Sequence, residues 1–225
     1  MKVGRKLLIA KRILLYGALL VCCFLGLAAY VALGYHPAPA EVVCSGNPGD
    51  MGKQYGPTLR FPLKLMTRIY LDRVLCGGQT SIIQSRRRRA EAALDSFPEV
   101  YQKELAAIAA ASGCEGSALA YGNCFLDLGH AVAGCRSVVI PTDTGWLRGH
   151  NLDWDNLGGS ARWTTCIVRR NPNDGRLRTV SIGFPGLIGS LDIINEKGLA
   201  LSFIQGLCDR EDSIDLRCDS GCLIG

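Results

Sequence analysis

Metal-binding and nucleotide-binding signatures are missing from this 225-residue sequence. It contains only three histidines, no two cysteines separated by two residues, and no glycine-rich phosphate loop. Structural zinc sites and nucleotide sites are built from such clusters. We therefore expect neither a bound metal nor another cofactor.

An excess of positive or negative charge is also missing beyond the N-terminus. The net charge is +5, and the first 12 residues alone carry five lysines and arginines and no acidic residue. The rest of the chain is therefore electrically balanced. A nucleic-acid-binding protein needs a basic surface to neutralise phosphates, so no nucleic-acid partner is expected.

A long apolar run follows these basic residues. Residues 13–33 carry no charge, and roughly 20 apolar residues of helix are enough to cross the hydrocarbon core of a bilayer. Basic residues before the run predict a cytoplasmic N-terminus and an exported remainder, which makes this protein a single-pass membrane protein. The alternative is a cleaved signal peptide, because residues 38–40 (APA) resemble a cleavage site. The length of the run and the position of Pro39 favour the uncleaved anchor.

Cysteines are frequent beyond this anchor. An exported domain is allowed to form disulfides, and setting one cysteine aside as a free thiol leaves an even number. The sequence does not assign pairs. The cysteines in question are Cys44, Cys76, Cys114, Cys124, Cys135, Cys166, Cys208, Cys218 and Cys222.

The pattern after the anchor predicts an α+β chain in three parts. Residues 1–40 are the anchor or signal segment, residues 41–134 a linker followed by a mainly helical region, and residues 135–225 a region of short strands. Glycines and prolines in residues 34–56, across the boundary between the first two parts, indicate a linker. Residues 97–111 have helix start and stop signals at Pro98-Glu99 and Gly113, and residues 117–128 are expected to form a strand and a turn.

The most informative stretch is residues 135–155 (CRSVVIPTDTGWLRGHNLDWD). Two short apolar runs surround a glycine-bearing turn, which predicts a β-hairpin. A hairpin would bring Cys135, at the start of the first strand, level with Asn151 and Asp153 at the end of the second. A thiol beside polar side chains that orient it is the general arrangement for covalent catalysis.

Three motifs in this region resemble the cysteine N-terminal-nucleophile (Ntn) hydrolases. They are residues 134–137 (GCRS), 149–154 (GHNLDW) and 195–199 (NEKGL), in that order and spacing. The superfamily includes penicillin acyltransferase, acid ceramidase and the choloylglycine hydrolases. The chain is most similar to the branch of acyl-coenzyme A:6-aminopenicillanic acid acyltransferases, over residues 99–205.

The resemblance implies a four-layer αββα sandwich and self-cleavage between Gly134 and Cys135. Cys135 would then be an N-terminal residue that supplies both a thiol and an α-amino group, and the α-amino group can act as a base near neutral pH. Family members continue well beyond the point where this sequence ends, so the sandwich is expected to be incomplete within residues 135–225. The activity of these residues alone stays open.

The resemblance also implies roles for residues beyond Cys135. Asp153 would orient the new amino group, with Asn151 on the same side of the strand. His150 stands where the ceramidase and bile-salt branches have arginine; it can still donate a hydrogen bond, and Arg148 on the same face could supply the missing charge. Gln205 matches the position of an oxyanion-stabilising asparagine, and its amide is also a donor.

Two functions from different classes remain open at this point. The first is a membrane-anchored hydrolase or acyltransferase that acts on linear amide bonds of N-acylated small molecules through a thioester on Cys135. The second is a membrane-tethered, disulfide-stabilised binding domain without catalytic activity, in which Cys135 is structural. A free α-amino group on Cys135 distinguishes the first from the second.

Overall fold

The computed structural model describes residues 2–33, 38–128, 134–153 and 164–204. The chain divides into two compact units, an N-terminal one that ends at Ala38 and a second one that begins at Pro39. The first unit contains helix α1 (Lys2–Leu33), whose segment Lys11–Tyr30 has a mean hydropathy of 2.3 and is long and apolar enough to span a membrane. An N-terminal signal sequence would meet the same criterion, so the helix supports the anchor and the signal peptide alike.

The second unit is built on a five-stranded sheet with the strand order β1-β4-β5-β6-β7. Strand β1 runs parallel to β4, and the other neighbours are antiparallel. The mixed α+β composition expected from the sequence is confirmed. The strands are β1 (Ala40–Gly46), β4 (Cys166–Pro172), β5 (Thr179–Gly183), β6 (Asp192–Asn195) and β7 (Ala200–Ser202).

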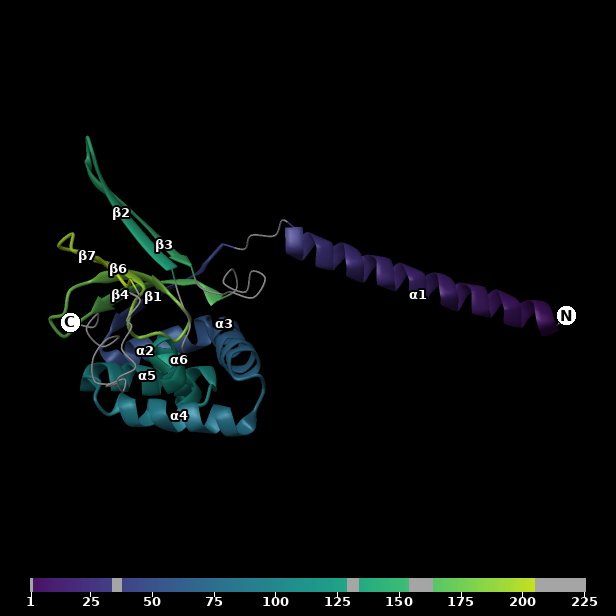
Figure 1. The fold of residues 1–225 in the computed structure, drawn as a ribbon, viewed down its shortest axis with the longest axis horizontal. Helices are drawn as coiled ribbons and strands as arrows, with labels where there is room; N and C mark the ends of the chain where they lie inside the picture. The colour runs from purple at the N-terminus through teal and green to yellow at the C-terminus, as the bar shows by residue number, and fades with distance from the viewer. Residues whose placement is uncertain (1, 34–37, 129–133, 154–163, 205–225) are drawn as a thin grey trace. The chain divides into compact units, whose positions relative to one another are not determined.

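Helices cover one face of this sheet (Figure 1). A cluster of buried side chains, among them Tyr55, Leu119 and Val168, joins the helices to the strands. The helices are α2 (Pro48–Thr58), α3 (Arg60–Lys64), the π-helix η1 (Leu65–Leu75), α4 (Thr80–Leu94), α5 (Glu99–Ser112) and α6 (Gly116–Leu128).

The predicted linker over residues 34–56 is wrong from residue 40 onward. Strand β1 buries Val42 and Cys44, and α2 begins directly after it. The side chain of Asn47 caps α2 by accepting a hydrogen bond from the backbone N–H of Asp50, and Pro48 occupies the first helical position, where a missing N–H costs nothing. The glycines and prolines of this segment therefore start and pack a helix instead of marking a loop.

Two other expectations for the helical region had opposite outcomes. The helix over residues 97–111 is confirmed as α5, which ends at Gly113 in the left-handed conformation (φ +69°). The strand and turn expected over residues 117–128 are wrong, because this segment is helix α6. Most of α6 is buried, including Tyr121 and Phe125, so it lacks the polar face that identifies a helix in sequence.

The contact between α2 and α5 depends on glycine. A Cβ atom on Gly52 would lie 2.5 Å from the carbonyl oxygen of Glu104 and 2.6 Å from Cβ of Ala107. We expect Gly52→Ala to lower the free energy of unfolding by about 1–3 kcal/mol, because the two helix backbones would have to separate. Gly116→Ala is the matched control, since a Cβ there meets nothing within 4 Å. Urea unfolding of the two variants, followed by near-ultraviolet circular dichroism, measures the difference, and equal stabilities would contradict the prediction.

Candidate functional site

The hairpin predicted from residues 135–155 is confirmed over its described part. Strands β2 (Gly134–Thr142) and β3 (Gly145–Asp153) pair antiparallel and form a two-stranded sheet of their own. The turn is tight, and Gly145 adopts a positive φ of 137° that a residue with a side chain would resist. In the register, Cys135 is opposite Leu152, Arg136 is opposite Asn151, and Gly134 is opposite Asp153.

This register decides which side chains share a face with Cys135. Side chains alternate between the two faces of a strand, and directly paired residues lie on the same face. Cys135 therefore shares its face with His150, two pairs further along the hairpin, whereas Asn151 is on the other face with Arg136. The predicted proximity of Cys135 to residues 151 and 153 holds for the backbone. The side chain of Asp153 and the whole of Gln205 lie outside the described residues.

His150 is held by a carboxylate from the five-stranded sheet. Its Nδ1 atom lies 2.7 Å from Oδ2 of Asp192 in β6, and only 4% of the His150 side chain is exposed. Because a carboxylate can only accept, the neutral imidazole carries its proton on Nδ1 and leaves Nε2 as an acceptor. Nε2 is buried and has no hydrogen-bond partner among the described residues.

A second side chain of β3 supports the same carboxylate. Nη2 of Arg148 lies 3.8 Å from Oδ1 of Asp192 and also donates to the hydroxyl of Ser202 in β7, which donates in turn to Oδ1 of Asp192. Asp192 and Ser202 are directly paired across β6 and β7. The carboxylate thus has partners on both oxygens, which fixes the plane it presents to His150.

The placement of Arg148 agrees with the expectation that it lies on the His150 face, but Asp192 and Ser202 were missed. Asp192 stands in an apolar run between Leu191 and Ile193, where an alternating strand with one carboxylate is a weak signal for a polar contact. Its partner is 42 residues earlier in the chain, and no local pattern connects the two.

Three buried thiols of the second unit, Cys44, Cys124 and Cys166, differ from Cys135 in their burial. Burial raises the pKa of Cys44 and Cys166 to about 11 and that of Cys124 to about 12, so these thiols stay protonated and unreactive near neutral pH. Cys135 is only partly buried. A thiol reagent should therefore reach it before these three.

No disulfide connects the cysteines that the structure describes, all of which are free thiols. Cys208, Cys218 and Cys222 lie outside the described residues, so the expected pairing is not decided for them. Among the described residues, no three histidine, cysteine, aspartate or glutamate side chains come together as metal ligands.

The asparagine at the start of the third motif, Asn195, stabilises the turn after β6. Its Oδ1 atom accepts hydrogen bonds from the backbone N–H groups of Lys197 and Leu199, and Gly198 has a positive φ of 82°. The motif thus connects β6 to β7.

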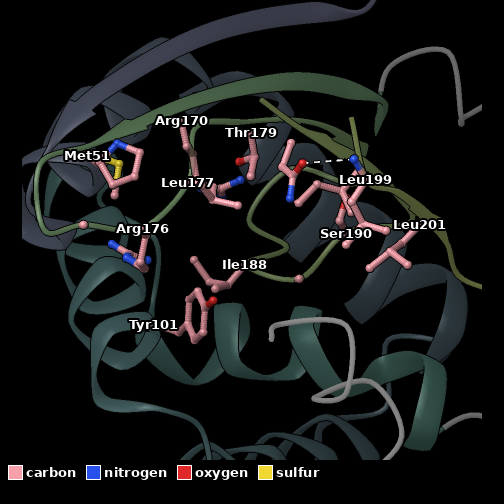
Figure 2. Close-up of a pocket in the computed structure, with 15 residues that line it drawn as sticks. Met51, Tyr101, Arg170, Arg176, Leu177, Thr179, Ile188, Ser190, Leu199 and Leu201 are labelled. Atoms are coloured by element: carbon pink, nitrogen blue, oxygen red, sulfur yellow. Dashed lines mark hydrogen bonds between the residues drawn. The ribbon is translucent and has the colours of Figure 1, made fainter. Parts of the chain in front are cut away.

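A cavity of about 300 Å³ lies elsewhere in the same unit (Figure 2). It is lined by Ile193 and Asn195 of the sheet together with Met51 of α2 and Tyr101 of α5. These strand residues alternate with Asp192, so the cavity opens on the helix-covered face of the sheet and Asp192 faces the other side. It is therefore separate from the group formed by Cys135, His150 and Asp192.

No protein-family model and no curated protein sequence matches this chain. The likeness to the Ntn hydrolases rests on the three motifs described above.

Proposed function

We propose that the chain is part of a membrane-anchored, exported cysteine Ntn hydrolase or acyltransferase of αββα architecture. Its substrates would be linear amide bonds of N-acylated small molecules, attacked by Cys135 to give a thioester. The observation that carries the proposal is His150, which is held by Asp192 on the face of the hairpin that bears Cys135, with its second ring nitrogen unpartnered. A histidine oriented by a carboxylate is a base that can activate a cysteine nucleophile, and here it shares a hairpin face with the thiol.

The first reaction would be self-cleavage. His150 Nε2 takes the proton of the Cys135 thiol, and the sulfur attacks the carbonyl carbon of Gly134. The bond between that carbon and the Cys135 nitrogen breaks, and the nitrogen receives the proton. Water then hydrolyses the thioester, which leaves a carboxylate on Gly134 and a free α-amino group and thiol on Cys135.

The second reaction would use the same sulfur on the substrate. The thiol attacks the substrate carbonyl, the amine leaves with a proton, and water or a second amine takes up the acyl group. Asp153 and Asn151 would orient the new α-amino group, and the amide of Gln205 would donate to the oxyanion. Arg148 provides the positive charge that arginine supplies at the His150 position in related branches.

The experiment that tests this proposal is an intact-mass measurement with N-terminal sequencing, beside Cys135→Ala. It should use the longest reading frame that contains this sequence. We expect a fragment that begins Cys-Arg-Ser-Val in the wild type and a single uncut chain in the variant. An uncut, folded wild-type protein would reject self-cleavage and favour the non-catalytic binding domain.

A further inference from the structure

The cavity shown in Figure 2 is lined by hydrogen-bond donors and by apolar side chains, and it has no role in the proposed function. Fifteen residues line it, of which two are arginines and none is aspartate or glutamate. Its volume of about 300 Å³ is at the lower end of the range for small-molecule sites in proteins.

A row of polar side chains crosses the sheet at this cavity. Arg170 of β4 pairs with Thr179 of β5, and Thr179 pairs with Asn195 of β6, so all three lie on the helix-covered face. Asn195 uses only its Oδ1 atom in hydrogen bonds with described residues, which leaves its amide N–H groups available. The Thr179 hydroxyl makes no side-chain hydrogen bond to another described residue, and Nη2 of the buried Arg170 has none either.

Arg176 adds a positive charge at the same cavity. Its Nε and Nη2 atoms bind the carboxylate of Asp174 at 2.8–3.0 Å, and its guanidinium lies 5.8 Å from the centroid of the Tyr101 ring. These contacts fix the orientation of the guanidinium. Nη1 makes no hydrogen bond to described residues and can bind a further acceptor.

The next row of the sheet is apolar. Ile193 of β6 pairs with Leu201 of β7, and both line the cavity with Ile188, Leu177 and Leu199. Donors at one row and apolar side chains at the next suit a ligand with a polar head and a hydrocarbon body.

We propose that this cavity binds a small amphipathic carboxylate. The carboxylate accepts hydrogen bonds from Arg176, Asn195 and Thr179, and the hydrocarbon part lies on Ile193 and Leu201. A neutral head group would accept fewer and weaker hydrogen bonds, because charge-assisted bonds to guanidinium are about twice as strong as neutral ones.

Hexanoate and its neutral analogue hexanamide are suitable probes. Both are titrated into the full chain in detergent and followed by ligand-detected nuclear magnetic resonance, with empty micelles as the blank. Saturable binding of hexanoate is expected, with hexanamide about tenfold weaker, as the loss of one charge-assisted hydrogen bond predicts. Arg176→Gln should weaken hexanoate about tenfold and leave hexanamide unchanged.

Two further variants complete the test. Leu201→Trp fills the apolar part and should abolish binding of both probes, whereas Arg178→Gln, at an exposed arginine that does not line the cavity, should change neither. Folding of each variant is checked by circular dichroism. Equal affinity for the two probes, or no saturable binding of hexanoate by the folded wild type, would overturn the proposal. Because Cys135 plays no part in this binding, the result is independent of self-cleavage.

Discussion

Asp192→Asn is expected to slow self-cleavage between Gly134 and Cys135 by about 100-fold or more, which is the lower range for the loss of a positioned general base. The asparagine side chain has nearly the same shape, so Ser202 and His150 keep a neighbour. Its amide can donate to Nδ1 of His150, however, and this would move the imidazole proton to Nε2. The histidine would then present a donor to the thiol in place of an acceptor.

The rate is measured by following the two fragments of freshly synthesised protein on a denaturing gel. Asp174→Asn serves as the matched control, because the described partner of the Asp174 side chain is Arg176, and no described hydrogen bond connects either residue to the hairpin. His150→Ala should be slow in the same way and should regain part of its rate when imidazole is added. Unchanged cleavage in both Asp192→Asn and His150→Ala would show that the proton of Cys135 goes elsewhere.

Glu104→Leu is expected to lower the free energy of unfolding by about 3–5 kcal/mol, because it leaves a buried arginine without its counter-charge. Glu104 is fully buried in α5, and its Oε1 atom accepts from Nε of Arg170 at 2.9 Å. Burial is the largest single influence and lowers the pKa of Arg170, but the surrounding groups, with the Glu104 carboxylate foremost, together outweigh it, and the net pKa is raised. Arg170 thus stays charged on the helix-covered face of the sheet, where, among the described residues, Glu104 and the hydroxyl of Ser181 are its side-chain hydrogen-bond partners.

A double variant shows whether the loss of stability comes from the broken ion pair or from a general packing defect. Glu104→Leu combined with Arg170→Met replaces both charges by apolar groups, which is often neutral for a buried ion pair. We expect it to be more stable than Glu104→Leu alone in urea unfolding. If the two substitutions were simply additive, the ion pair would not be the reason for the loss.

How much of the fold could be predicted depended on whether the signals were local. The hairpin and α5 were recognised because a glycine turn and a left-handed Gly113 mark their ends within a few residues. Strand β1 was missed because it pairs with β4, more than 120 residues later in the chain, and nothing near residue 40 shows this. Gly52 has the appearance of a loop residue in the sequence, although it serves close helix packing.

The candidate site divides in the same way. Cys135, His150 and Arg148 lie on one hairpin, so their common face follows from the two-residue period of a strand. Asp192 depends on the placement of the hairpin against β6, which is a tertiary contact. The prediction that Asn151 lies beside the thiol rests on its position along the hairpin. It ignores the alternation of side chains between the two faces of a strand.

Because β1 pairs with β4, cleavage of the chain after residue 134 would leave two peptides that stay associated in one folded molecule. The first peptide would keep β1, α2 and α6, and the second β4 to β7. Seven backbone positions of β1 and β4 would still be in register, and the hydroxyl of Tyr55 would still accept from the backbone N–H of Gly186 at 2.7 Å. The cleaved protein would migrate as a single species under native conditions, and its two peptides would separate only in denaturant. The N-terminal peptide would keep the C-terminal peptide attached to the apolar helix α1.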